Sequence, residues 1–149
     1  MTKALLVLLL LAALPAAAGE RFDSAPLTIE TRDGRSLPFT VELAVSPAQR
    51  QQGLMFREAL APDAGMLFLY PRSGMIQMWM RNTLIPLDML FLAPDGLVVA
   101  TADNAVPLSE AIIAPGVPAR AVLELPGDAI ERLHLRPGDR VVYPGLDGD

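Results

Sequence analysis

Cysteine is absent from the 149-residue chain, and histidine occurs once, as His134. The lack of cysteine excludes disulfides, Cys-ligated zinc, iron–sulfur clusters, thiol nucleophiles and a lipid-modified N-terminal cysteine. A single histidine excludes a His-rich metal site, and no nucleophile-elbow sequence accompanies it, so we interpret His134 as a surface residue. The sequence predicts no cofactor and no metal centre.

Positive charge is also scarce. Lys3 is the only lysine, and 12 basic residues face 17 acidic ones, giving a formal net charge of −5. There is no phosphate-binding glycine loop, calcium-binding loop or basic stripe. This acidic balance disfavours nucleic acid and an anionic membrane surface as partners.

The first 18 residues have the layout of a secretory signal peptide. A short positive start containing Lys3 precedes an apolar run over 4–14, and the small residues Ala16 and Ala18 stand at the positions that signal peptidase prefers. The apolar run is too short to span about 30 Å of hydrocarbon comfortably. We therefore predict cleavage after Ala18, a periplasmic or secreted location, and no stable membrane insertion of the mature chain, residues 19–149.

Short apolar runs separated by turn signals predict a mainly β domain. Alternation is clearest over 37–45, where every second residue is apolar. Asp33-Gly34 and Pro94-Asp95-Gly96 indicate hairpin turns. About eight short strands in one domain are typical of a β-sandwich or a distorted barrel. The predicted strands are 27–31, 37–45, 65–70, 75–81, 87–93, 97–102, 121–125 and 140–143.

Two short helices are expected beside these strands. Ser46 is a good N-cap, Gln49 stands at the capping-box position, and Gly53 can end the first helix. Asp128 and Glu131 have the same spacing at the start of the second helix. The proline-punctuated segment 107–118 is predicted to be a loop.

Several motifs follow one another along the chain: Arg50, Gly53-Leu54-Met55-Phe56-Arg57, Gly65-Met66-Leu67-Phe68, Trp79-Met80-Arg81-Asn82-Thr83, Pro86-Leu87-Asp88, Val122-Leu123-Glu124-Leu125 and Pro137-Gly138-Asp139-Arg140-Val141. Together they resemble a known family, the domain-of-unknown-function 192 family. The resemblance covers roughly 39–142, and the run from Trp79 to Asp88 is its most specific part. It implies a bacterial or archaeal protein, often exported, with a jelly-roll-like β-sandwich fold and no established activity, so no catalytic residue is implied.

Polar side chains within these motifs suggest a binding site. Arginine presents a planar fork that suits carboxylate, phosphate or sulfate. If Arg50, Arg57, Asn82 and Asp88 converge, they form one concave site for a small anionic or carbohydrate-like ligand, or for an envelope component. The alternative is that Arg50 or Arg57 pairs internally with Asp88, Glu42 or Glu124. The predicted ligand-binding set is Arg50, Arg57, Trp79, Asn82, Thr83, Asp88 and Glu124.

Two other functions remain open at the level of sequence. Asp88 and Glu124 each interrupt an apolar stretch, and two carboxyls within about 10 Å across a cleft could serve a glycan or ester hydrolase. Six of the seven methionines lie between Met55 and Met89, and thioethers suit Cu(I) or Ag(I). Core packing is the favoured interpretation of Met78 and Met80, because they share a predicted strand face with Ile76.

Overall fold

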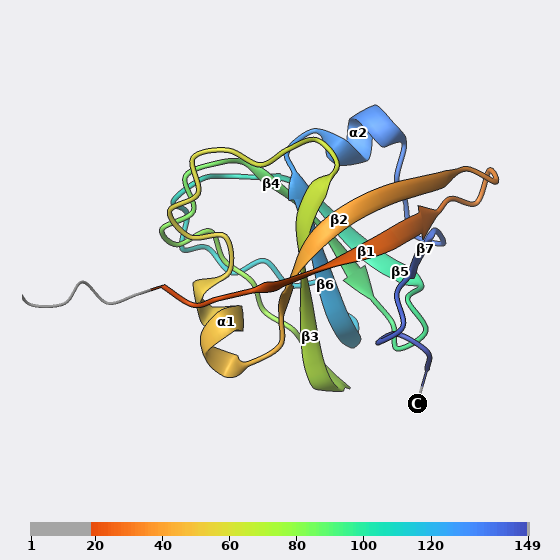
Figure 1. Ribbon diagram of the computed structural model, residues 1–149, viewed down its shortest axis with the longest axis horizontal. Coiled ribbons are helices and arrows are strands. Elements are labelled where there is room, and N and C mark those ends of the chain that lie inside the picture. Colours follow the sequence, from red (N-terminus) through yellow and green to blue (C-terminus); the bar gives the residue numbers. More distant parts are fainter. Residues whose placement is uncertain (1–18, 149) are drawn as a thin grey trace, which may run out of the picture.

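The computed structural model describes residues 19–148, so the predicted signal peptide lies outside the described residues. The fold is mainly β, as expected, with two short helices (Figure 1). The elements are β1 (Asp23–Glu30), β2 (Ser36–Ala44), α1 (Pro47–Gln52), β3 (Ala64–Gly74), β4 (Leu87–Leu92), β5 (Val98–Ala105), β6 (Ala119–Pro126), α2 (Ala129–Leu133) and β7 (Arg140–Val142).

All seven strands form one curled sheet in the order β5-β4-β6-β3-β2-β1-β7. Neighbouring strands are antiparallel except β2 and β3, which are parallel. The two outer strands approach each other, because the Val98 amide donates to the Asp139 carbonyl at 2.8 Å and the Val141 amide to the Gly96 carbonyl at 2.8 Å. Of the two predicted architectures, the distorted barrel therefore describes the curled sheet better than two stacked layers.

The inner face of the sheet is apolar. Phe39 and Val41 of β2 are buried there, and Leu37 and Leu43 pack against the same cluster, which confirms the alternation predicted for this strand. Val45 is an exception, because it lies beyond the end of β2 and is 53% exposed. Burial of this face supplies the hydrophobic stabilisation that closes the barrel.

A second apolar cluster covers the outer face of β3, β4 and β6 beneath three irregular segments, 53–63, 75–86 and 106–118. Backbone hydrogen bonds join these segments: the Met78 amide donates to the Ile113 carbonyl, the Met80 amide to the Ser109 carbonyl, and the Phe56 amide to the Asn82 carbonyl, all at 2.9 Å. The predicted strand over 75–81 is wrong, since this stretch has only an isolated bridge.

The two helices differ in how they begin. In α1 both bonds of the predicted capping box form, between Ser46 and Gln49. In α2 the predicted cap is wrong: Asp128 has φ 67° and its side chain makes no capping bond. Asp88 replaces it from β4, since its Oδ2 accepts the Ile130 amide at 2.7 Å. The buried carboxylate of a distant strand residue thus accepts a hydrogen bond from a free backbone amide at the start of α2.

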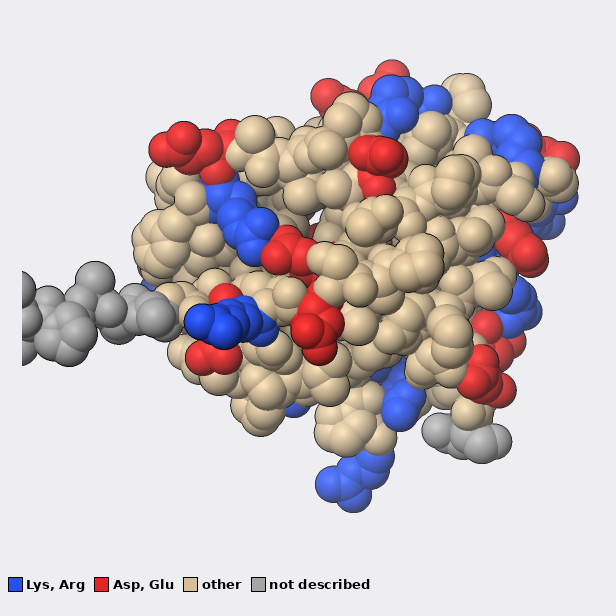
Figure 2. All heavy atoms as spheres, in the orientation of Figure 1, with Lys and Arg blue, Asp and Glu red and all other residues tan. Residues whose placement is uncertain are grey.

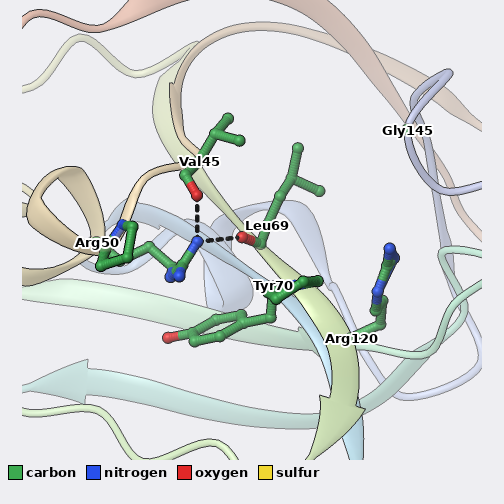
Figure 3. A pocket seen from close by; sticks show the side chains of 8 residues that line it. Val45, Arg50, Leu69, Tyr70, Arg120 and Gly145 are labelled. Atoms are coloured by element: carbon green, nitrogen blue, oxygen red, sulfur yellow. Dashed lines mark hydrogen bonds between the residues drawn. The ribbon is translucent and has the colours of Figure 1, made fainter.

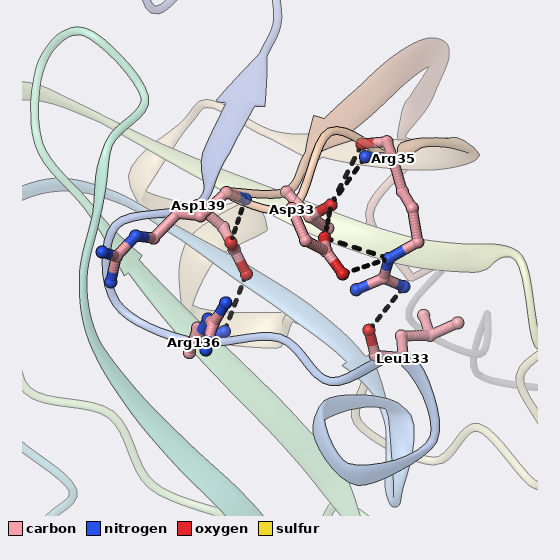
Figure 4. Close-up of polar contacts among 7 residues, drawn as sticks. Asp33, Arg35, Leu133, Arg136 and Asp139 are labelled. Carbon is pink, nitrogen blue, oxygen red and sulfur yellow. Dashed lines mark hydrogen bonds and ion pairs between the residues drawn. The ribbon is translucent and has the colours of Figure 1, made fainter.

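A polar network holds the β1–β2 turn against the turn that precedes β7 (Figure 4). The Asp139 carboxylate accepts the Arg32 amide at 2.9 Å and the Arg136 amide at 2.8 Å. Arg35 donates to Asp33 at 3.0 Å and to the Leu133 carbonyl at 2.9 Å. Since Asp139 is almost fully buried and doubly bonded, we assign it to the closure of the fold.

Acidic and basic side chains are interspersed on the face shown in Figure 2, and neither sign forms a continuous area there. Within 19–148, no helix has both the length and the apolar character that crossing a membrane requires.

Candidate functional site

The predicted convergence of Arg50, Arg57, Asn82 and Asp88 is not observed. Arg50 and Asn82 line two different surface hollows, and Asp88 is completely buried. Arg57 instead forms a bidentate ion pair with Glu42, with both N–O distances at 2.9 Å. The internal pairing considered for Arg57 is therefore present, and the candidate residues belong to several separate environments.

The first hollow has a volume of about 430 Å³ and lies between α1, β3, the start of β6 and the loop at Gly145. Arg50 projects into it from α1 and donates through one terminal nitrogen to the backbone carbonyls of Val45 and Leu69, the latter at 2.9 Å (Figure 3). Its guanidinium carbon lies 4.9 Å from the centroid of the Tyr70 ring. These contacts hold the Arg50 guanidinium in place but do not neutralise its positive charge.

A second arginine reaches this hollow. Arg120 projects from β6 on the other side of Leu69 and Tyr70 from Arg50 (Figure 3). Its Nε atom is buried and has no hydrogen-bond partner. Neither Arg50 nor Arg120 takes part in any of the ion pairs formed within residues 19–148. Sequence reasoning missed Arg120; its only signal was a charged residue at the start of the apolar strand that also contains Glu124.

Tyr70 separates the two guanidiniums and continues into the core beneath them. Its hydroxyl donates to the Met78 sulfur at 3.7 Å. Burial raises the pKa of Tyr70; the charge of Arg50 opposes this effect, and Glu124 adds to it. Tyr70 is thus a neutral hydrogen-bond donor and an aromatic platform for Arg50.

The second hollow, of about 410 Å³, carries exposed aromatic side chains. Phe56 is 67% exposed and Trp79 is 37% exposed, and the Arg81 guanidinium lies 5.4 Å from the Trp79 ring centroid. Phe56 and Asn82 both have positive φ, 63° and 53°, and one backbone hydrogen bond joins them. Asn tolerates positive φ, whereas for Phe56 it is costly, so the surrounding segments must hold Phe56 outward.

Thr83 and Asp88 have structural roles. Thr83 is buried in the turn after Asn82, and its hydroxyl donates to the Arg81 carbonyl at 3.2 Å. Asp88 accepts the Asn104 and Ile130 amides, each at 2.7 Å. Both side chains are occupied by backbone groups and are not free for a ligand.

The proposed hydrolase pair, Asp88 and Glu124, lies on opposite faces of the sheet. Leu90 and Leu92, which share a face with Asp88, pack in the inner cluster. Val122, which shares a face with Glu124, packs in the outer cluster. Because successive side chains of a strand alternate between faces, the two carboxyls cannot flank one cleft.

Glu124 is the most unusual group on the outer face. It is only 4% exposed, and burial raises the pKa of its carboxyl to about 8. Desolvation is the sole cause of this shift, so no hydrogen bond or opposite charge compensates it. The carboxyl is therefore largely protonated at pH 7, unlike Asp88, which accepts two backbone amides.

The methionines around Trp79 do not form the surface cluster required for metal binding there. Met75 is 60% exposed, whereas Met78 and Met80 are buried in the outer cluster, on the face predicted from the sequence. Among residues 19–148, no three side chains of His, Cys, Asp or Glu form a group that could hold a metal ion.

Comparison with known proteins identifies the class of protein that this fold represents. A model of the DUF192 family, described as an uncharacterized ACR family, matches residues 28–143. The chain belongs to this family, which confirms the resemblance seen in the sequence motifs.

Two solved structures are similar over most of their length. A protein from Sinorhizobium meliloti 1021, described as a "putative transcription regulator", is 46% identical, with a TM-score of 0.84, and the match covers 87% of this chain and 100% of the other. A protein of unknown function from Novosphingobium aromaticivorans DSM 12444 is 39% identical, with a TM-score of 0.77 and coverage of 89% and 91%. The chain matches no curated protein.

Proposed function

We propose that the protein is a binding module for a small ligand that carries a carboxylate, sulfate or phosphate group, held in the hollow between Arg50 and Arg120. The observation that carries this proposal is the pair of guanidiniums that line one hollow and form no ion pair with any carboxylate of residues 19–148. The buried, unpartnered Nε of Arg120 leaves a donor for an incoming acceptor. Charge-assisted hydrogen bonds of this kind are among the stronger ones in proteins.

The contacts of Arg50 support the same function. Two backbone carbonyls and the Tyr70 ring hold its guanidinium in place before any ligand arrives. Preorganisation lowers the entropic cost of binding, because the long side chain is already ordered. In a chain with a net charge of −5, a local pair of cations is also selective for anions over neutral molecules.

Isothermal titration with inorganic sulfate and with galacturonate, using galactose as the uncharged probe, tests the proposal. We expect the anions to bind and galactose not to bind. Arg50→Gln and Arg120→Gln should each weaken anion binding roughly 10-fold or more, as expected for loss of a hydrogen bond to a charged group. The matched control is Arg72→Gln, which removes an exposed arginine of β3 outside the hollow. Equal weakening in Arg72→Gln, or unchanged binding in both hollow variants, would refute the proposal.

The aromatic hollow favours a second candidate function, binding of an uncharged carbohydrate-like ligand. An exposed Trp79 ring beside the Asn82 amide offers an apolar platform next to a hydrogen-bonding group. In this case galactose or a related neutral sugar should bind, and Trp79→Ala should abolish the binding while Arg50→Gln leaves it unchanged. The same titrations therefore distinguish the two functions.

Export is part of the proposed function. The layout of residues 1–18 supports secretion into the periplasm or beyond, where the module would meet a small molecule or an envelope component. Mass spectrometry of the protein recovered from the periplasmic fraction should give a mature chain that starts at Gly19. A chain that retains Met1 would contradict cleavage.

A further inference from the structure

Glu124 has a methionine on each side in the sheet. Met66 of β3 and Met89 of β4 are its register partners in the two adjacent antiparallel pairings. Directly opposed residues on one face have Cβ atoms about 4.5–5.5 Å apart. The carboxyl therefore lies between two thioether side chains, and both methionines are completely buried.

Within residues 19–148, the Glu124 carboxyl takes part in none of the ion pairs. Asp88 and Asp139, the other two buried acidic residues of 19–148, each accept two backbone amides. Glu124 has no hydrogen bond or opposing charge that acts on its carboxyl. A largely buried carboxyl costs stability unless something pairs with it, so Glu124 is available to an occupant.

Two further methionines belong to the same outer cluster as Met66 and Met89. Met80, from the segment above the sheet, is completely buried in the same outer cluster, and Met78 belongs to it as well. The Met78 sulfur accepts the Tyr70 hydroxyl. Met66 and Met89, the register partners of Glu124, and Met80 of the same cluster are the remaining buried thioethers of the outer face. The residual 4% exposure of Glu124 provides a path for a small ion.

The donor set determines the class of ion. Thioethers are soft ligands that select Cu(I)-like ions, whereas Ca²⁺ and Mg²⁺ require several oxygen ligands. One carboxylate neutralises a single positive charge, so a monovalent ion leaves no net charge in the apolar interior, and a divalent ion would leave one. We propose that Glu124, Met66 and Met89 bind one soft monovalent cation of the Ag(I) or Cu(I) class, with Met80 of the same cluster as a further donor. The ion replaces the carboxyl proton, which is released to solvent, and no electron is transferred.

This site is separate from the arginine hollow, because none of its four residues lines that hollow. It also differs from the methionine set first considered around Trp79, since it uses Met66 and Met89 on the strands. The proposal does not depend on anion binding, and either can fail without the other.

Calorimetric titration of the whole protein with silver nitrate in chloride-free buffer tests the site directly. We expect one Ag(I) per chain. Met66→Leu and Met89→Leu should each weaken binding roughly 10-fold or more, the loss expected when a ligand is removed, and the double variant should bind no Ag(I). Leucine has nearly the same volume as methionine, so these variants are expected to fold. Met75→Leu is the matched control, because Met75 is exposed and lies outside the cluster.

Methyl resonances of labelled methionine give a second measurement that does not depend on affinity. The methyl signals that disappear in Met66→Leu and Met89→Leu should be those that shift most on addition of Ag(I), and the Met75 methyl should not shift. Glu124→Gln should lower the affinity while keeping the fold. Absence of Ag(I) binding, or binding unchanged in the double variant, would overturn the proposal.

Discussion

Replacement of Glu124 by glutamine should remove a large pH dependence of stability. Burial raises the pKa of Glu124 to about 8 in the folded protein, from 4.5 in the free side chain. Between these two values the folded state holds a proton that the unfolded state releases, so stability falls as pH rises. Each pKa unit between the folded and unfolded states corresponds to about 1.36 kcal/mol. The free energy of unfolding should therefore fall by at most about 5 kcal/mol between pH 4.5 and pH 8.

Urea unfolding of the metal-free protein between pH 5 and pH 9 measures this effect. The free energy of unfolding of the wild type should fall across the range and level off above pH 8, whereas Glu124→Gln should change much less. Contributions from other titrating groups are common to both proteins and cancel in the difference. Glu30→Gln, an exposed strand position, should keep the wild-type slope. A wild-type stability that is constant from pH 5 to pH 8 would show that the carboxyl is solvated or paired, and would refute the reasoning.

Three further substitutions have expected outcomes that thermal or urea denaturation can measure. Asp88→Ala leaves two backbone amides without their acceptor and should cost about 2–5 kcal/mol; a loss below 1 kcal/mol would contradict its role. Gly96→Ala should destabilise by about 2 kcal/mol or more, because Gly96 has φ 80° and its Cβ would lie 2.0 Å from the Val141 carbonyl oxygen. Asp95→Asn removes an exposed ion pair with Arg140 and should cost under about 1 kcal/mol. The hydrogen bond from Arg140 lowers the pKa of Asp95, so this small contribution is present above pH 4 and is lost as pH falls below the lowered value.

Local patterns in the sequence predicted the local parts of the fold. The alternation over 37–45 identified the buried face of β2, and Ser46 with Gln49 identified the start of α1. The hairpins at Gly34 and Gly96 form between the expected strands. In each case the interactions that determine the structure involve residues close together in the sequence. A local pattern of side chains is therefore enough to predict it.

Features that depend on distant residues were not predictable in this way. The segment 75–81 alternates like a strand, but its backbone bonds mostly to other irregular segments and its buried residues pack on the sheet from outside. Asp128 has the sequence position of a cap, yet Asp88 of β4 provides the acceptor. Arg50 and Arg120 line the same hollow only because β3 pairs with β6 and α1 packs beside these strands. No local pattern indicates that two such residues share a hollow.

The inner face of the sheet contributes mainly to stability, whereas the outer face carries the residues proposed to bind ligands. Apart from Asp88, the inner face is apolar, and hydrogen bonds at Val98 and Val141 join the two outer strands. A substitution of an apolar residue there therefore loses mainly packing. The outer face carries the unpartnered carboxyl of Glu124 and the Tyr70 platform, and irregular segments cover it and hold exposed aromatic side chains. A buried carboxyl without a partner and a non-glycine residue with positive φ both lower stability, and they persist only where other contacts compensate for them. Leu123→Ala on the inner face should therefore lower stability without a specific effect on ligand affinity, whereas Arg120→Gln on the hollow should change affinity with little loss of stability.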